Sequence, residues 1–133
     1  MKTIKQTISF NASTNDIYEY LTNPKKLTKI TGAKATNDLK VGGKFTAWDD
    51  YIFGTNVELV PGKKIKQKWS CQDFPEKHFT DISIELKKKT EKQTELVFTQ
   101  ENVPDEFYED INQGWNDFYW EPIKDYIEDL MWK

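Results

Sequence analysis

Hydrophobic residues near the N-terminus recur at every second or fourth position. Ile4, Ile8 and Phe10 lie on one side of this alternation, and mostly polar residues separate them. Successive side chains of a β-strand point to opposite faces of its sheet, so this pattern is typical of a strand that buries one face. We therefore expect a half-buried strand over residues 3–10.

Two helix starts follow this strand. Ser13 is followed three residues later by Asp16, a spacing that resembles a capping box with an acid shorter than the usual glutamate. Asn23 and Pro24 form the second start, because asparagine can accept free backbone N–H groups and proline lacks an N–H that would otherwise be unpaired. Gly32 is suited to end the second helix. The sequence thus predicts two short helices between residues 13 and 32.

Between residues 33 and 100 the period returns to two, and turn residues separate the alternating segments. Pro61-Gly62 has the residues of a type II turn, and a polar stretch from Lys87 to Gln93 predicts another turn. The residues that alternate with polar or small neighbours are Phe45, Ala47, Phe53, Thr55, Val57, Leu59, Ile65, Gln67, Trp69, Ile82, Ile84, Leu86, Leu96 and Phe98. With the first strand, this pattern predicts an antiparallel meander of six to seven strands, one face of which is in solvent.

From Pro104 onward the period becomes that of an α-helix. At about 100° per residue, the following hydrophobic residues cover roughly one half of a helical wheel: Tyr108, Ile111, Trp115, Phe118, Tyr119, Pro122, Ile123, Tyr126 and Leu130. Trp120 falls on the opposite, polar side, and Pro122 is expected to kink the helix because it removes one backbone hydrogen bond. We predict one long C-terminal helix and an α+β fold in which residues 1–133 form a single domain.

Length and composition narrow the class of protein. The chain has 133 residues, of which 37% are hydrophobic and 31% are charged, which suits one domain. No apolar run approaches the roughly 20 residues that a membrane span requires, and the N-terminal residues lack the apolar stretch of a secretory signal. Cys71 is the one cysteine, so no internal disulfide can form and a reducing compartment is favoured. We expect a cytoplasmic protein without a membrane span.

Charge is unevenly distributed along the chain. All 19 basic residues are lysine, and the absence of arginine argues against a bidentate site for phosphate or carboxylate groups. Residues 1–100 hold 17 lysines and 12 acids, whereas residues 101–133 hold two lysines and ten acids. The net charge is −3, and the acidic last third would repel phosphate groups. No nucleic-acid partner is therefore expected.

Residues that commonly carry catalysis or bind metals are sparse. One histidine and one cysteine give a zinc site too few of its usual ligands, so we expect neither a metal nor a cofactor. Cys71 and His78 are the one plausible pair of nucleophile and base, but they flank a loop and lie in no catalytic signature. Gly42-Gly43 lacks the Lys-Ser/Thr pair of a phosphate loop and favours backbone freedom before a strand. The chain is therefore more plausibly a non-enzymatic protein than an enzyme.

Aromatic residues are the most informative chemical feature. Five tryptophans and eight phenylalanines provide more bulk than the core between one sheet and one helix needs. Such rings can fill the core, or they can wall a cavity for a small hydrophobic or amphipathic ligand, and their spacing leaves both interpretations open. The candidates to line the cavity are Phe45, Phe53, Val57, Gln67, Trp69, Phe98, Trp115 and Tyr119. Trp48 is a less certain candidate, since it alternates away from Phe45.

Two groups of motifs resemble a known family. The first comprises Tyr20–Leu27, Val41–Phe45, Gly54–Ile65 and Lys68-Trp69, and the second comprises Gly114-Trp115, Phe118-Tyr119-Trp120 and Pro122. Together they resemble the family named after the C-terminal domain of the activator of heat-shock protein 90 ATPase. That family is a branch of the START-like, or SRPBCC, helix-grip superfamily, and the resemblance covers nearly the whole chain.

The resemblance implies a helix-grip fold, in which a curved antiparallel sheet of six to seven strands wraps around a long C-terminal helix. Many helix-grip domains bind sterols, lipids or polyketides between the sheet and the helix, and others are enzymes whose catalytic residues lie in that space.

Three functions therefore stay open. The first is a non-enzymatic module that encloses a small ligand, and the second is a co-chaperone-like domain acting on a heat-shock protein 90-type ATPase. The third is a cyclase- or hydrolase-like enzyme. In the second function, the acids that would meet a basic surface are Asp110, Asp117, Glu121, Glu128 and Asp129.

Overall fold

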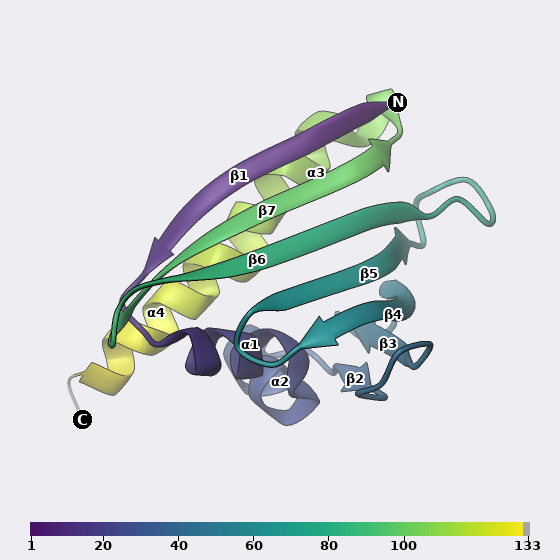
Figure 1. Cartoon of the computed structure of the whole chain (residues 1–133). Coiled ribbons are helices and arrows are strands. Elements are labelled where there is room, and N and C mark those ends of the chain that lie inside the picture. Colours follow the sequence, from purple (N-terminus) through teal and green to yellow (C-terminus); the bar gives the residue numbers. More distant parts are fainter. Residues whose placement is uncertain (132–133) are drawn as a thin grey trace.

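A curved antiparallel sheet forms one layer of the molecule, and the long C-terminal helix lies along one of its faces (Figure 1). The computed structural model describes residues 1–131. The strands are β1 (Lys2–Phe10), β2 (Thr36–Asn37), β3 (Lys44–Ala47), β4 (Ile52–Val60), β5 (Lys64–Cys71), β6 (Thr80–Thr90) and β7 (Gln93–Val103). Their spatial order is β1-β7-β6-β5-β4-β3-β2, so β1 and β2 are the edges. The predicted α+β class is confirmed, as is a sheet of seven strands around the helix.

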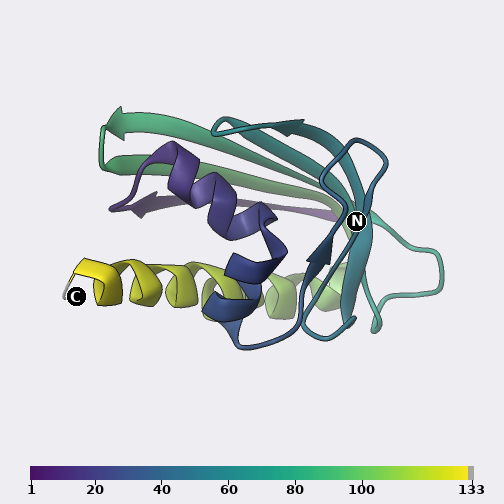
Figure 2. The same cartoon turned by 90° about the horizontal axis from the view of Figure 1, so that it is seen from below.

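Two short helices connect β1 to β2 and begin at the predicted caps. α1 (Thr14–Thr22) follows Ser13, whose side chain accepts a backbone N–H at 3.1 Å. α2 (Pro24–Thr31) follows Asn23, whose side chain accepts two backbone N–H groups, and it ends at Gly32 with a φ of 79°. Figure 2 shows that this helix pair lies between the sheet and the C-terminal helix. The pair therefore closes one side of the space between the two layers.

The C-terminal helix contains a π-helical turn that the sequence analysis does not anticipate. After a short 3₁₀ turn, η1 (Asp105–Phe107), α3 (Tyr108–Trp115) continues through the π-helical segment η2 (Asn116–Trp120) into α4 (Glu121–Met131). A π turn holds about one residue more than an α turn, because each N–H bonds to the carbonyl five residues back. Side chains beyond it are therefore rotated around the helix relative to a uniform helical wheel.

This rotation explains two errors of the wheel. Trp120 is predicted on the polar side, but it is 1% exposed and its indole N–H donates to Gln6 Oε1 at 2.7 Å. Phe118 is predicted on the buried half, but it is 54% exposed. Leu130, also predicted on the buried half, is 43% exposed in the last turn of α4, although it lies on the same helix face as the buried Ile127. Pro122, where we expect a kink, directly follows the π turn within the first turn of α4. The wheel is wrong here because it assumes the α-helical angle at every residue.

The inner face of β4 also differs from the prediction. Phe53 and Val57 are 36% and 45% exposed, so they lie on the solvent side of the sheet. The inner face carries Gly54 and Asn56, both buried. Alternation in a strand gives two sets of residues, and a shift by one residue exchanges their faces. The hydrophobic set is the outer one here, because the inner positions include a glycine and a polar residue.

Both predicted turns of the meander are present. Gly62 has a φ of 71°, and the N–H of Lys63 donates to the carbonyl of Val60 at 2.9 Å, which confirms the turn at Pro61-Gly62. The turn after β6 is shorter than predicted, because β6 extends to Thr90 and β7 begins at Gln93. Lys87, Lys88 and Lys89 belong to β6, but all three side chains are exposed. The sequence there therefore lacks the alternation that would indicate a strand.

The core lies between the sheet and the C-terminal helix. Its largest fully buried hydrophobic residues are Ile4, Phe10, Ile17, Ile65, Leu96, Phe98, Val103, Trp120 and Ile123. None of the helices in residues 1–131 is long and apolar enough to cross a membrane.

Candidate functional site

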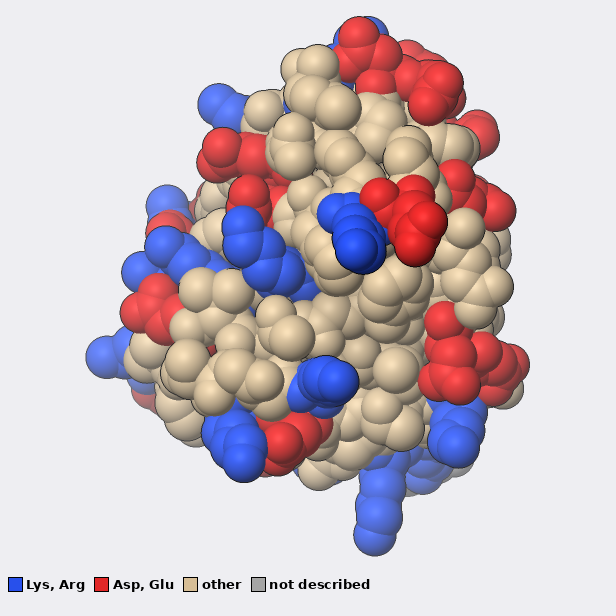
Figure 3. Space-filling model, turned by 90° about the vertical axis from the view of Figure 1, so that its right-hand side faces the viewer, with Lys and Arg blue, Asp and Glu red and all other residues tan. Residues whose placement is uncertain are grey.

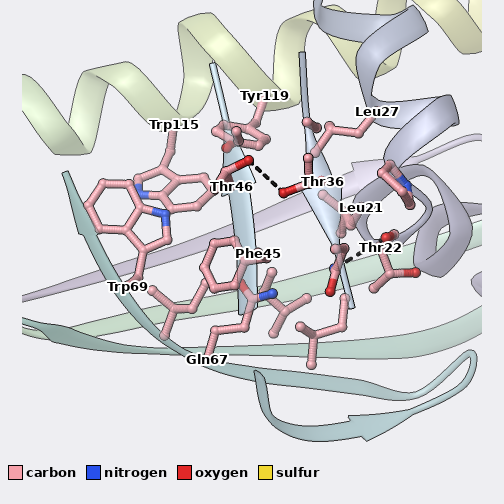
Figure 4. Close-up of a pocket in the computed structure, with 17 residues that line it drawn as sticks. Leu21, Thr22, Leu27, Thr36, Phe45, Thr46, Gln67, Trp69, Trp115 and Tyr119 are labelled. Carbon is pink, nitrogen blue, oxygen red and sulfur yellow. Dashed lines mark hydrogen bonds between the residues drawn. The ribbon is translucent and has the colours of Figure 1, made fainter. Parts of the chain in front are cut away.

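Three of the predicted cavity residues form one aromatic wall. Trp115 and Tyr119 project from the C-terminal helix, and Trp69 projects from β5 (Figure 4). The ring of Trp115 lies 5.7 Å from that of Trp69 and 4.5 Å from that of Tyr119, measured between ring centroids. All three side chains are at most 7% exposed. This wall separates two hollows of very different size.

A chain of hydrogen bonds through Gln100 and Thr80 links two residues of the aromatic wall, Trp115 and Trp69. The indole N–H of Trp115 donates to Gln100 Oε1 at 2.8 Å, and Gln100 Nε2 donates to Thr80 Oγ1 at 3.0 Å. Thr80 Oγ1 in turn donates to the carbonyl of Trp69 at 2.8 Å. Gln100 and Thr80 are fully buried, and a buried polar group without a partner is costly. The chain therefore holds Trp115 and Trp69 in one relative position.

The inner hollow is almost filled by side chains. It lies on the side of α2, β2 and β3, and its volume is about 40 Å³. That volume admits a few water molecules at most. Phe45 and Gln67 line it together with the aromatic wall. Gln67 Nε2 donates to Asn56 Oδ1 at 3.0 Å, so its polar group is satisfied within the fold. The inner hollow has no room for a sterol or a lipid.

A much larger cleft lies on the other side of the aromatic wall. Its volume is about 560 Å³, within the range of small-molecule sites. The first turns of α3, the turn between β3 and β4, and the end of β5 meet around it. Besides Trp69, Trp115 and Tyr119, its lining residues are Trp48, Tyr51, Ile52, Cys71, Asp73, Phe107, Asp110, Ile111, Gly114 and Phe118. Most of this surface is apolar, and much of it is aromatic.

The side of the cleft formed by Trp48 has a strained backbone. Trp48, Asp49 and Asp50 have φ angles of 52°, 56° and 73°, and side chains other than glycine rarely adopt such angles. The ring of Trp48 packs edge-on against Phe118, with 5.4 Å between centroids. Three consecutive residues of this kind cost on the order of 1–3 kcal/mol each. Such strain is concentrated at functional sites in proteins, which makes this turn notable.

Burial raises the pKa of three titratable side chains that line the cleft, those of Tyr119, Cys71 and Tyr51. Burial raises the pKa of the Tyr119 phenol, and the nearby Trp48 indole opposes that rise. The Trp48 N–H itself is buried and meets no partner at hydrogen-bond geometry among the described residues. Burial likewise raises the pKa of the Cys71 thiol and, together with the hydrogen bond to Asp73, that of the Tyr51 phenol. Cys71 is therefore a poor nucleophile at neutral pH.

The pair of Cys71 and His78 does not assemble as a catalytic unit. His78 Nε2 lies 2.8 Å from the carbonyl oxygen of Asn102, and its ring packs against Phe74. Cys71 instead neighbours Tyr51 and Asp73. Within residues 1–131, no three His, Cys, Asp or Glu side chains come together as metal ligands would.

Figure 3 shows the end of the molecule that is on the right of Figure 1. Acidic side chains gather along the upper and right-hand edges of this view, lysines are more frequent along the left-hand and lower edges, and much of the surface between them is uncharged (Figure 3). Two carboxylates, Asp73 and Asp110, line the cleft itself, and no lysine does. Both acids are exposed. The cleft thus combines apolar walls with negative charge at its edge.

The remaining predicted cavity residues lie elsewhere. Phe98 is fully buried beneath Trp115, with 4.5 Å between ring centroids, and lines neither hollow. Phe53 and Val57 are wrong as cavity residues because they lie on the outer face of the sheet, where Phe53 packs against Phe79.

Sequence reasoning missed most of the cleft. Tyr51, Phe107 and Ile111 come from a turn and from the start of a helix, where no strand alternation marks an inner face. One signal for the cleft was available in the sequence. Trp48 falls outside the alternation of its strand and is followed by two aspartates, and three bulky or charged residues after a short strand suggest an unusual turn.

Comparison with known proteins identifies the family to which the chain is related. Residues 11–128 match the family described as activator of Hsp90 ATPase homolog 1-like protein. The chain is 34% identical over 122 residues to the human activator of 90 kDa heat shock protein ATPase homolog 1, covering 92% of this chain and 35% of that protein. It is 30% identical over 119 residues to the mouse homolog 2, covering 90% of this chain and 36% of that protein. The chain thus spans about a third of the length of these curated relatives.

Solved structures agree with this assignment. A crystal structure of an HSP90 activator from Plasmodium falciparum superimposes with a TM-score of 0.86 at 26% identity, covering 92% of this chain and 94% of that one. The solution structure of the Aha1 dimer from Colwellia psychrerythraea gives a TM-score of 0.80 at 26% identity, covering 96% and 97% of the two chains. The predicted resemblance is confirmed, and the chain belongs to the activator of Hsp90 ATPase homolog 1-like family, with a helix-grip fold.

Proposed function

We propose that the chain is a co-chaperone-like domain that binds an ATPase of the heat-shock protein 90 type and stimulates it. The observation that carries this proposal is the 34% identity to a named activator of that ATPase along 92% of the chain. The single cysteine favours a reducing compartment, so we expect this action in the cytoplasm.

The acidic outer surface of the C-terminal helix supports a protein-binding role. Asp110, Asp117, Glu121, Asp125 and Glu128 are all exposed along it. Glu121 and Asp125 are four residues apart, where like charges destabilise a helix by about 0.2–0.5 kcal/mol. A free helix N-terminus would offset such repulsion, but α4 continues directly from η2 and has no free first turn. A basic partner surface would relieve this repulsion.

A charge-reversal experiment tests the proposal. The double variant Glu121→Lys/Asp125→Lys is compared with Glu85→Lys/Glu91→Lys, which changes the same charge at exposed positions of the sheet and its β6–β7 turn. The readout is stimulation of a purified heat-shock protein 90 ATPase as the concentration of the chain increases. The helix variant should raise the half-maximal concentration about tenfold, or ~1.4 kcal/mol, and the sheet variant less than twofold.

Salt provides a second arm of the same experiment. The Debye length is about 10 Å at 0.1 M salt, so an association that depends on exposed carboxylates should weaken as salt increases. If the unchanged chain does not bind the heat-shock protein 90 ATPase at low salt, the proposal is wrong. Equal activity of both variants would keep the function and exclude this helix face as the docking surface.

We also infer a second function, the binding of a small hydrophobic or amphipathic molecule. The supporting observation is the cleft of about 560 Å³ beside the aromatic wall. The inner hollow, where the sequence predicts this ligand, is too small to hold it. Native mass spectrometry of gently purified protein, followed by denaturation, would identify a stoichiometric small molecule. Protein that carries no molecule and binds no aromatic probe would contradict this inference.

A further inference from the structure

The cleft beside the aromatic wall has a charge preference built into its lining. We propose that it binds small organic cations with an aromatic or apolar body, the ammonium group lying near Asp73 and Asp110. This proposal rests on the second function inferred above, the binding of a small molecule in the cleft, and it specifies the chemical class of that molecule.

Two carboxylates supply the negative charge. Asp110, in the first turn of α3, forms no hydrogen bond or ion pair within the described part of the chain. Asp73 lies after the end of β5 and accepts a hydrogen bond from the Tyr51 hydroxyl. An accepted hydrogen bond leaves the second oxygen of that carboxylate able to take another donor. An ammonium group has three donors, which is enough for one hydrogen bond to each carboxylate.

The aromatic walls favour a cation in addition. The faces of tryptophan, tyrosine and phenylalanine rings attract a cation within about 6 Å of the ring centre, and tryptophan does so best. Trp48, Tyr51, Phe107 and Phe118 stand around the cleft in front of the Trp69–Trp115 wall. The apolar body of the ligand would displace water from these rings. No lysine lines the cleft to repel the ammonium group.

The buried indole N–H of Trp48 adds a third element. It meets no partner at hydrogen-bond geometry within residues 1–131, although the Tyr119 phenol is nearby and a buried donor of this kind is usually paired. Trp48 lines the cleft, and the backbone of its turn is strained. A hydroxyl or ether oxygen on the body of the ligand could accept this hydrogen. Naphthylmethylamine lacks such an oxygen, whereas the hydroxyl of naphthylmethanol could accept this hydrogen, so a preference for the amine measures the effect of the carboxylates against that of this donor.

The test uses three probes with the same aromatic body. Naphthylmethylamine is cationic at neutral pH, naphthylmethanol is neutral and naphthoate is anionic. Tryptophan fluorescence and the indole N–H signals in NMR spectra report their binding to the full chain. The amine should bind about tenfold more tightly than the alcohol, and the naphthoate should bind most weakly. This preference should shrink as salt increases, because both carboxylates are exposed.

Two variants localise the effect. Asp110→Asn keeps the shape of the side chain and should lower the preference for the amine over the alcohol to about threefold or less. Glu91→Gln removes the same charge from the β6–β7 turn, at the opposite end of the sheet, and should leave the preference unchanged (Figure 1). A urea titration of each variant checks that the fold is intact.

The outcomes separate two claims: that the cleft binds small molecules, and that it prefers cations. Equal affinity for amine and alcohol, with the indole signal of Trp48 shifted by both, would overturn the preference for cations while supporting the cleft as a binding site. No binding of any probe would overturn both. If Asp110→Asn leaves the preference for the amine over the alcohol unchanged, the Asp110 carboxylate does not contribute to that preference.

Discussion

The two hollows on either side of the aromatic wall share Trp69, Trp115 and Tyr119, yet one holds about 40 Å³ and the other about 560 Å³. On the inner side, α2, β2 and β3 bring further side chains against these rings, and the polar groups there bond to one another. On the outer side, a turn and the start of a helix leave a cleft beside the rings, although the rings themselves are at most 7% exposed. The same aromatic cluster thus borders a filled region on one side and an open cleft on the other.

The polar groups of the two hollows differ in the same way. Gln67 and Asn56 are buried on the inner side and donate to partners within the fold. The Trp48 N–H on the outer side has no such partner within residues 1–131. The filled side thus pairs its donors within the fold, whereas the cleft side has a buried donor without such a partner within residues 1–131.

The largest expected effect comes from opening the core next to Trp115 and Phe98. Trp120→Ala removes a side chain that is 1% exposed and leaves Gln6 Oε1 without its donor. Substitutions of this kind cost about 3–5 kcal/mol of unfolding free energy. Urea denaturation measures that loss. A loss below about 1 kcal/mol would show that the core tolerates the cavity.

A smaller loss is expected from the hydrogen-bond chain behind the wall. Gln100→Leu leaves the indole N–H of Trp115 buried without an acceptor, at a cost of about 1–3 kcal/mol. Gln93→Leu, an exposed position on the same strand, is the matched control and should change stability by less than about 0.5 kcal/mol. Equal effects in the two variants would exclude a special role of the buried chain.

Alkaline pH offers a third comparison. Burial raises the folded-state pKa of Tyr119 above its ordinary value of 10.0, so below pH 10 the phenol is neutral in both states and its contribution is complete. Above that pH the unfolded chain loses the proton first, and the free energy of unfolding falls as pH rises, by up to about 1.36 kcal/mol per pH unit for one group.

Tyr119→Phe should therefore reduce the loss of stability between about pH 8 and pH 11. It should not abolish it, because burial also raises the pKa values of Tyr18 and Tyr20. Urea titrations at both pH values give the difference. A variant that loses as much stability as the unchanged chain would show that Tyr119 ionises freely in the folded state.

The smallest effect on stability is expected at the edge of the open side. Phe118 is 54% exposed, so Phe118→Ala should change the free energy of unfolding by less than about 1 kcal/mol. The same variant should weaken binding of naphthylmethylamine, because the ring stands beside Trp48 at the cleft. Unchanged binding, measured by fluorescence, would move the ligand away from Phe118.

Patterns that depend on near neighbours were predictable from the sequence. Ser13, Asn23 and Gly32 mark the ends of both short helices, because caps need one side chain or one φ angle at a fixed position. The burial of Trp69, Trp115 and Tyr119 was predictable because strand and helix periods held around them. The family resemblance added the helix-grip arrangement.

Features that depend on distant packing were not predictable. The π turn that buries Trp120 changes the helical period without a marker that the wheel could detect. The inner face of β4 carries Gly54 and Asn56, so hydrophobicity indicated the opposite face. The cleft is assembled from a turn, a strand end and a helix start, and no local period connects those three.

A crystal structure with naphthylmethylamine bound would test the contrast between the two hollows most directly. The account predicts the naphthyl ring between Trp48 and Trp115, with the ammonium group directed to Asp73 and Asp110. A ring inside the inner hollow, with Phe45 or Gln67 displaced to admit it, would contradict the account.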